Sequence, residues 1–233
     1  MAFHFRQFTV EDALSTLRIG TDAMLLGSWA DPGKAANILD IGTGCGVLAL
    51  MMAQKSGAHI KAIDIDEPSV AEATQNFANS PWSSRLEAMH GAVQQISLPE
   101  DRRFDFILTN PPYFTNALKS PSPRINRTRH DDNLSLAELA ACIDRLLSPD
   151  GRFAVILPPE QSAHFQVQCA FPGFHPSHSL TVYPRPAAGA KRILTEFSRV
   201  ECGPPLTTSL TIIDDGGKYS PEYLALTLNF HNF

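Results

Sequence analysis

Short runs rich in β-branched and aromatic residues alternate with amphipathic segments from residue 35 onward. This alternation is typical of a parallel sheet covered by helices, so the pattern predicts an α/β fold. We expect strands at residues 37–40, 59–64, 86–89, 104–109 and 152–157, and helices at residues 46–55, 68–79, 135–147 and 159–169. Two further β-rich runs, residues 179–183 and 192–200, flank a turn-rich segment and are expected to pair as an antiparallel hairpin at the sheet edge.

The length and composition predict a single domain. The 233 residues are 43% hydrophobic, which is enough apolar sequence for one full-sized core over residues 1–233, with residues 1–34 as an N-terminal cap segment. The first residues do not form a signal-peptide pattern, and no apolar run approaches the roughly 20 residues that a membrane span needs. We therefore expect a cytoplasmic protein that does not associate with membranes.

Cysteine spacing and charge limit the possible ligands. The four cysteines are far apart and form no C-x-x-C pair, so neither a metal site nor a disulfide framework is expected. The net charge of −5 argues against a protein that binds nucleic acids through overall charge. Any RNA must be held locally, and the loop at residues 119–130, with four Lys or Arg and one His, is the candidate.

A glycine-rich turn joins the first predicted strand to the first predicted helix. It reads Asp40-Ile-Gly42-Thr-Gly44-Cys-Gly46, and glycines let the backbone turn tightly and approach a ligand closely. The spacing fits neither a dinucleotide-binding G-x-G-x-x-G loop nor a G-x-x-x-x-G-K-[ST] phosphate loop, which disfavours NAD and nucleoside triphosphates. A structural turn would explain the glycines alone. The second predicted strand, however, ends at Asp64, where a carboxylate can bind two ribose hydroxyls.

With its leading acid, this turn resembles motif I of class I methyltransferases. The resemblance implies a Rossmann-like three-layer sandwich with a mostly parallel sheet, and S-adenosyl-L-methionine as the cofactor. It places the backbone of Ala92 near the cofactor adenine. The other cofactor-binding residues that it implies here are Asp40, Gly42, Gly44, Gly46 and Asp64. Asp64 could also be a plain strand-end residue, and Asp66 and Glu67 are more simply interpreted as the cap of the next helix.

A second motif, Asn110-Pro111-Pro112-Tyr113, follows the strand predicted at residues 104–109, at the edge of the sheet where open α/β folds bind ligands. An amino nitrogen conjugated to a ring is a poor nucleophile, because its lone pair is delocalised. Acceptors at the Asn110 side chain and the Pro111 carbonyl would favour the pyramidal geometry that attacks a sulfonium methyl group. Tyr113 can stack on a flat substrate. A strand-terminating turn is the plainer interpretation.

This motif resembles motif IV of the amino-methyltransferases that act on adenine, guanine and protein glutamine. The resemblance implies that Asn110, Pro111, Pro112 and Tyr113 are catalytic and that Asn110 also contacts the cofactor. No general base is expected, because the developing cationic amine is acidic enough to lose its proton afterwards. The motif indicates the type of acceptor atom and leaves the substrate open.

The segments at residues 3–8 and 17–22 read F-H-F-R-Q-F and L-R-I-G-T-D. They are similar to the F-x-F-K-Q-F and K-V-G-T-D of the bacterial tRNA1(Val) adenine-37 N6-methyltransferases, with Arg6 and Arg18 as conservative departures. The likeness runs almost end to end, through the N-P-P-Y-F motif and the closing residues 219–233. The terminal His231-Asn232 departs from the usual aromatic tail, a difference that concerns only the packing of the tail.

This resemblance implies methyl transfer from the cofactor to N6 of adenine 37, in a tRNA held by its anticodon stem-loop, with no obligate protein partner. It also implies that Thr21 and Asp22 cover the cofactor site, although either could simply cap a following helix. Exposed loops are often charged without binding anything, but the basic loop offers three candidate contacts to the phosphates of the anticodon stem. They are Arg124, Arg127 and Arg129.

Three alternatives stay open. A protein glutamine substrate is disfavoured, because the methyltransferases of release factors carry a helical domain before motif I and only 39 residues precede Asp40. A ribosomal-RNA or small-molecule methyltransferase would share both motifs. A catalytically silent RNA-binding homologue would keep the fold, but the intact motifs argue against it.

Overall fold

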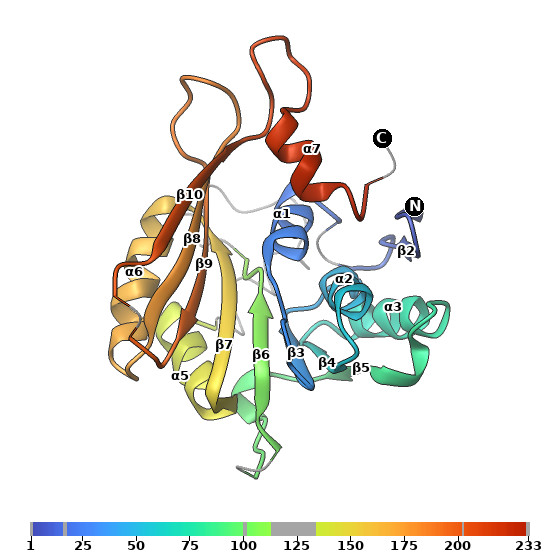
Figure 1. Ribbon diagram of the computed structural model, residues 1–233. Coiled ribbons are helices and arrows are strands. Elements are labelled where there is room, and N and C mark those ends of the chain that lie inside the picture. Colours follow the sequence, from blue (N-terminus) through green and yellow to red (C-terminus); the bar gives the residue numbers. More distant parts are fainter. Residues whose placement is uncertain (1, 16–17, 100–101, 113–133, 202, 232–233) are drawn as a thin grey trace.

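The computed structural model describes residues 2–15, 18–99, 102–112, 134–201 and 203–231 (Figure 1). These residues form a sheet of eight strands in the order β10-β8-β9-β7-β6-β3-β4-β5, and a separate two-stranded hairpin near the N-terminus. The hairpin consists of β1 (Ala2–His4) and β2 (Thr9–Glu11). The five predicted strands are present as β3 (Asn37–Ile41), β4 (His59–Asp64), β5 (Leu86–His90), β6 (Phe104–Thr109) and β7 (Leu147–Leu157).

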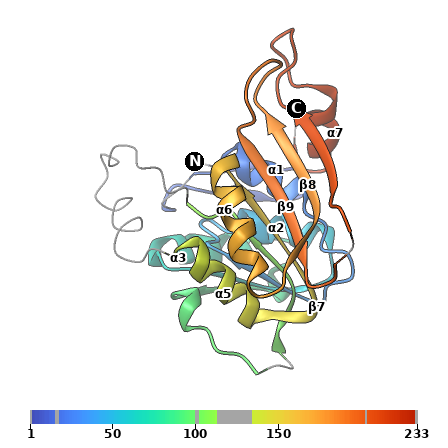
Figure 2. The same ribbon diagram turned by 90° about the vertical axis from the view of Figure 1, so that its left-hand side faces the viewer.

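Helices cover both faces of the sheet (Figures 1 and 2). One apolar cluster includes residues of α1 (Thr21–Trp29), α2 (Val47–Lys55), α3 (Glu67–Ala78) and α7 (Pro221–Thr227). The cluster on the other face includes residues of α5 (Leu136–Leu146) and α6 (Pro159–Ala170). The predicted three-layer arrangement is therefore confirmed. No helix within the described ranges combines the length and apolarity of a membrane span.

The predicted antiparallel hairpin is confirmed, but a further strand lies between it and the edge of the sheet. Strands β8 (His175–Tyr183) and β9 (Arg192–Ser198) pair antiparallel, and β9 also runs antiparallel to β7. Strand β10 (Leu206–Thr211) pairs parallel with β8 and occupies the edge. Sequence analysis missed β10 because its four exposed residues carry no apolar alternation. An edge strand can join a sheet mainly through backbone hydrogen bonds.

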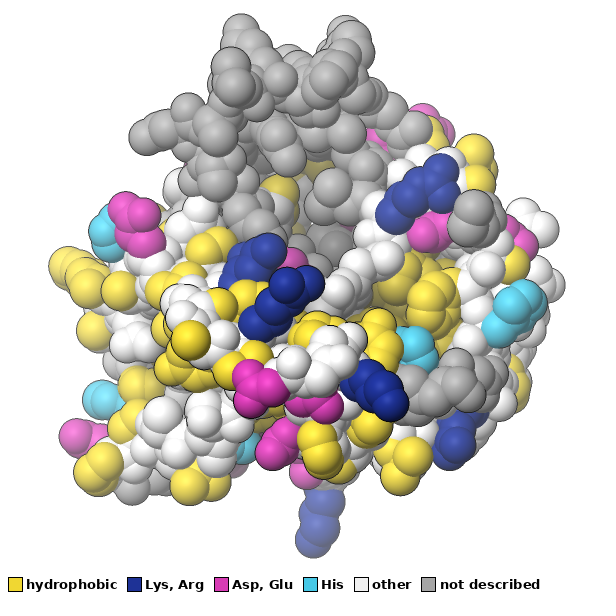
Figure 3. All heavy atoms as spheres, turned by 90° about the horizontal axis from the view of Figure 1, so that it is seen from above, with side chains coloured by type: hydrophobic (Ala, Val, Ile, Leu, Met, Phe, Trp, Pro, Cys, Tyr) yellow, Lys and Arg dark blue, Asp and Glu magenta, His cyan; other side chains and the backbone are white. Residues whose placement is uncertain are grey.

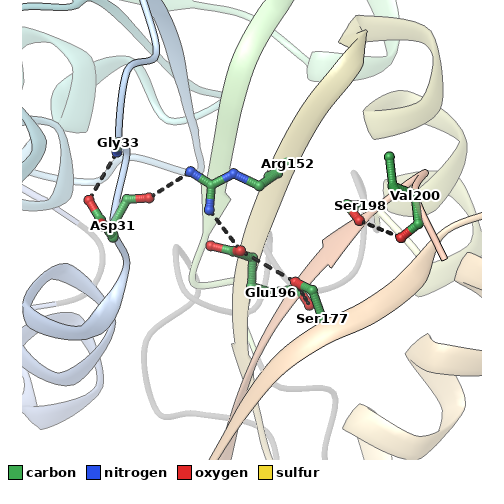
Figure 4. Close-up of polar contacts among 7 residues, drawn as sticks. All are labelled: Asp31, Gly33, Arg152, Ser177, Glu196, Ser198 and Val200. Carbon is green, nitrogen blue, oxygen red and sulfur yellow. Dashed lines mark hydrogen bonds and ion pairs between the residues drawn. The ribbon is translucent and has the colours of Figure 1, made fainter. Parts of the chain in front are cut away.

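A polar network ties this half of the sheet to the chain that follows α1 (Figure 4). Arg152 of β7 donates to Glu196 of β9 at 2.7 Å and to the carbonyl of Asp31 at 3.1 Å. Ser177 of β8 donates to the same carboxylate oxygen at 3.3 Å. The network thus links three strands and a loop.

The direction in which the chain builds the sheet reverses between β3 and β6. From β3 the chain continues to β4 and β5 on one side, whereas β6 and β7 lie on the other side. The two strands are in register to their ends, with Ile41 opposite Thr109. Open α/β sheets bind ligands outside the carboxyl ends of strands at such a switch point, so the segments that follow β3 and β6 are placed for binding.

Candidate active site

The glycine-rich turn after β3 is anchored to the end of the neighbouring strand β4. The amides of Gly42 and Thr43 both donate to the carbonyl of Ile63, at 2.9 and 3.1 Å, and the amide of Gly46 donates to the carbonyl of Thr43 at 2.9 Å. Gly42, Gly44 and Gly46 have φ angles of 72°, 55° and 85°, which glycine adopts at little cost. The turn is therefore a backbone shape that depends on glycine.

At two of these glycines the space beside the Cα atom is open, and at the third it is occupied by a neighbouring side chain. A Cβ atom added at Gly42 or Gly44 would meet no atom within 4 Å. At Gly46 it would lie 2.5 Å from Cε1 of Phe77, in the buried core beside α3. Gly42 and Gly44 thus leave one side of the loop open to a ligand, while Gly46 lets the start of α2 lie against Phe77 of α3.

We expect Gly46→Ala to lower the free energy of unfolding by about 2–4 kcal/mol, because overpacking against Phe77 adds to the strain of a positive φ. Urea denaturation measures this change. Gly57→Ala is the matched control, since a Cβ there meets nothing within 4 Å. Equal stability of the two variants would contradict the packing role of Gly46.

Asp40, the last residue but one of β3, has a fully buried side chain. Its Oδ2 accepts a hydrogen bond of 2.6 Å from the Thr43 hydroxyl, whereas its Oδ1 is buried without a partner among the described residues. Burial raises the pKa of this carboxyl to about 7, the Thr43 hydroxyl opposes the shift, the charge of Asp64 adds to it, and the backbone amide of Ala49 opposes it. Because buried polar atoms are nearly always satisfied, Oδ1 is suited to accept a hydrogen bond from a ligand.

Asp64 ends β4 and faces the glycine-rich turn. Its two oxygens accept hydrogen bonds from the amides of Gly44 and Asp66, at 2.8 and 2.9 Å. Burial raises the pKa of the carboxyl, and the backbone hydrogen bonds oppose that shift. Each carboxylate oxygen can accept a further bond, so the group can receive two hydroxyls. The capping interpretation is confirmed for Asp66, which accepts hydrogen bonds from the amide and hydroxyl of Ser69.

Ala92 follows β5 on the far side of Asp64. The amide of Gly91 donates to the Asp64 carbonyl at 3.0 Å, and the Ala92 carbonyl accepts from the amide of Gln95 at 3.0 Å. The structure thus brings Ala92 beside the end of β4. Its carbonyl is already used within the turn, which leaves the amide as the backbone group for a ligand contact.

Asn110 follows β6 directly, beside the end of β3. The preceding Thr109 is buried and its hydroxyl donates to the carbonyl of Ile41 at 2.9 Å, which fixes the end of β6 against β3. Asn110 is half-buried, Pro111 is buried and Pro112 is exposed. Tyr113 lies outside the described residues.

The N-terminus of α1 lies at the same edge of the sheet. The residue that precedes this helix is Gly20, and no side chain caps it, so the interpretation of Thr21 or Asp22 as the cap is wrong. Thr21 is exposed, whereas Asp22 accepts a hydrogen bond from Nε of Arg192 at 3.0 Å and forms an ion pair with its Nη2, also at 3.0 Å. Arg192 begins β9, which runs antiparallel, and so lies at the carboxyl ends of the parallel strands. Sequence analysis missed this pair, because nothing local joins two residues so far apart.

The structure thus gathers the glycine-rich turn, Asp40, Asp64, Ala92 and Asn110 around the ends of β3 to β6. The RNA-binding candidates Arg124, Arg127 and Arg129 lie outside the described residues. Within the part of the chain that the structure describes, no three His, Cys, Asp or Glu residues form a group that could hold a metal ion.

Comparisons with known proteins give the same picture of the fold. The model of the family described as "Methyltransferase small domain" matches residues 13–171. A predicted O-methyltransferase from Agrobacterium tumefaciens superimposes with a TM-score of 0.67 at 18% identity, covering 90% of this chain and 96% of that one. A ribosomal protein L11 methylase from Lactobacillus delbrueckii gives a TM-score of 0.53 at 20% identity, with 76% of each chain covered. These structures share the methyltransferase fold.

Curated relatives match nearly the full length. A protein of Phocaeicola vulgatus named tRNA1(Val) (adenine(37)-N6)-methyltransferase is 42% identical, over 98% of this chain and 97% of its own. Proteins of the same name from Bacteroides fragilis and Trichodesmium erythraeum are 39% and 38% identical over the same shares. The family model matches more than half of the residues of this chain. The chain therefore belongs to the methyltransferase small domain family, among the tRNA1(Val) (adenine(37)-N6)-methyltransferases.

Proposed function

We propose that this protein transfers a methyl group from S-adenosylmethionine to N6 of adenine 37 in tRNA1(Val). The observation that carries the proposal is the placement of Asn110-Pro111 directly beside the glycine-rich turn, across the paired ends of β3 and β6. The names of relatives that match end to end support the tRNA substrate. A cytoplasmic location is part of the same proposal.

The residues around the turn fit this cofactor. The free Oδ1 of Asp40 would accept from the amino group of the methionine part, and the Asp64 carboxylate from the ribose hydroxyls. Gly42 and Gly44 leave room for the methionine part, Ala92 offers its backbone to the adenine, and the Thr21-Asp22 segment covers the site. When bound, S-adenosylmethionine supplies an electrophilic methyl group on a sulfonium.

Asn110 and Pro111 would prepare the acceptor nitrogen. The Asn110 side-chain oxygen and the Pro111 carbonyl accept from the two hydrogens of the adenine amino group, which directs its lone pair towards the methyl group. These acceptors gain strength as positive charge develops on the nitrogen. The methylated amine then loses a proton to water without a dedicated base. Pro111 and Pro112 stiffen the backbone that holds both acceptors.

The face above the strand ends carries mixed charge (Figure 3). Exposed Arg185 and Lys191 flank the β8–β9 turn, and Lys218 lies in the connection after β10, which also contains Asp214 and Asp215. Because positive and negative side chains are interspersed among the described residues of this face, these residues create no field of a single sign. RNA binding would then depend on local contacts, for which we propose Arg124, Arg127 and Arg129.

Replacing Arg124, Arg127 and Arg129 together by alanine is expected to weaken tRNA binding by about tenfold or more near 100 mM salt. Each lost phosphate contact should lower the salt dependence of log Kd by about 0.7–0.9. Filter binding over a salt series measures both effects, and titration with S-adenosylhomocysteine should give the wild-type Kd. An unchanged salt dependence would remove this loop from the RNA site.

Methyl transfer from labelled S-adenosylmethionine to tRNA that lacks the modification tests the function. Nucleoside digestion should yield N6-methyladenosine, and a tRNA1(Val) transcript with guanine at position 37 is the matched control. Labelling of ribosomal RNA or protein in place of tRNA would overturn the assigned substrate. Cofactor binding without any transfer would favour the catalytically silent alternative.

A further inference from the structure

Two polar side chains of α3 face the interior of the protein. Glu72 is 4% exposed and Asn76 is 2% exposed, although helix α3 lies at the surface with other residues in solvent. Burying polar groups costs free energy unless they are hydrogen-bonded. Their partners therefore show what these residues hold in place.

Asn76 contacts two segments that are distant in the sequence. Its amide nitrogen donates to the carbonyl of Cys45 in the glycine-rich turn at 2.9 Å, and to the carbonyl of Glu11 at 2.8 Å. Its oxygen accepts from the amide of Glu11 at 2.9 Å. A single side chain thus joins the glycine-rich turn to the N-terminal segment.

The bond to Cys45 fixes one peptide plane. The Cys45 carbonyl is held by Asn76, and the amide of the next residue, Gly46, donates to Thr43 at 2.9 Å. The peptide is therefore bound at both ends. Glycines on both sides of Cys45 would otherwise let this peptide rotate at little cost, because glycine adopts positive and negative φ about equally well.

The same helix also binds residues 14 and 15 of the N-terminal segment, and a further hydrogen bond lies within the segment itself. The two oxygens of Glu72 accept from the amides of Leu14 and Ser15, each at 2.8 Å, and Asp12 accepts from the amide of Ile19 at 3.1 Å. Residues 11–15 and Ile19 are thereby held just before α1 begins at Thr21. Any change in the position of this segment would reach the residues proposed to cover the cofactor.

We propose that Asn76 is a positioning residue that couples the shape of the glycine-rich turn to the position of residues 11–15. It contacts neither cofactor nor substrate and acts through the Cys45 peptide. The inference rests on the proposed use of S-adenosylmethionine. Because coupling between two sites is reciprocal, a cofactor that selects one shape of the loop also stabilises the N-terminal segment.

Asn76→Asp tests the donor, since it keeps the size and one acceptor oxygen but cannot donate to Cys45 and Glu11. We expect the Kd for S-adenosylhomocysteine, measured by calorimetry, to rise about tenfold or more, as for the loss of a buried hydrogen bond. When the concentration of S-adenosylmethionine is varied at saturating tRNA, its KM should rise by a larger factor than kcat falls. Thr74→Ala, at an exposed position of the same helix, is the matched control.

Hydrogen exchange tests the coupling directly, first in the wild-type protein and then in the variant. S-adenosylhomocysteine should slow exchange in the peptide covering residues 9–20, including the amide of Glu11, and Asn76→Asp should abolish this protection. Two outcomes would overturn the inference and leave the proposed function standing. One is an Asn76→Asp variant that binds S-adenosylhomocysteine with the wild-type Kd. The other is hydrogen exchange in the 9–20 peptide that does not change when S-adenosylhomocysteine binds. A wild-type protein that binds no S-adenosylhomocysteine would overturn the proposed function and the inference together.

Discussion

Replacing Asn110 by alanine is expected to lower kcat for tRNA methylation by about two to four orders of magnitude, while the Kd for S-adenosylhomocysteine changes by less than about threefold. The Asn110 oxygen would accept from an amine that becomes positive only as the new bond forms, so its contribution belongs mainly to the transition state. An interaction of this kind lowers kcat and kcat/KM together when it is removed. Single-turnover methylation with excess enzyme measures the chemical step directly.

Two variants separate this role from a structural one. Asn37→Ala removes the same side chain at the exposed, opposite end of β3 and should leave turnover unchanged. Asn110→Asp keeps an acceptor oxygen and should retain more turnover than Asn110→Ala. Turnover of Asn110→Ala within tenfold of wild type, in a protein that melts normally, would refute the role proposed for the side chain.

The parts of the fold that sequence analysis predicted are those with local causes. Strands β3, β4 and β6 are short, largely buried runs with a polar residue at or next to their carboxyl ends, and the glycine-rich turn is a contiguous pattern. The helix predicted from Ser135 is present as α5, where Ser135 and Glu138 form a reciprocal capping box. Each of these signals lies within a few residues of the element that it specifies.

The missed features depend on contacts between distant segments. Arg192 meets Asp22 only because β9 runs antiparallel and brings its first residue to the site. Asn76 looks like an ordinary polar residue of an amphipathic helix until the N-terminal segment and Cys45 are placed around it. The need for glycine at position 46 comes from the Phe77 ring as well as from the turn.

Asp40→Asn is expected to make the ligand-free protein more stable and the cofactor complex weaker. Burial raises the pKa of the Asp40 carboxyl from its ordinary 3.8 to about 7 in the folded protein. The folded state therefore binds this proton more tightly than the unfolded chain does. The resulting stability is fully present below pH 3.8 and is lost as the pH rises through 7.

Above pH 7 the ionised Asp40 should therefore reduce the stability of the ligand-free protein by roughly 2–4 kcal/mol, and asparagine should remove this loss. Thermal unfolding between pH 5.5 and 8.5 measures it. Relative to that of Asp40→Asn, the wild-type melting temperature should fall from pH 5.5 to about 7 and level off above pH 7. Asp150→Asn, at an exposed position, should follow the wild type.

The titration of Asp40 should also affect cofactor binding, but there the ionised carboxylate is the favoured form. The ionised carboxylate is the form that pairs with the amino group of S-adenosylhomocysteine, so wild-type affinity should weaken as the pH falls below 7. Asp40→Asn should bind about a hundredfold more weakly at pH 8, as for a lost charge-assisted hydrogen bond, and should show little change with pH. A variant that binds S-adenosylhomocysteine as tightly as the wild type at pH 8 would show that the unpartnered Oδ1 of Asp40 does not contact the cofactor.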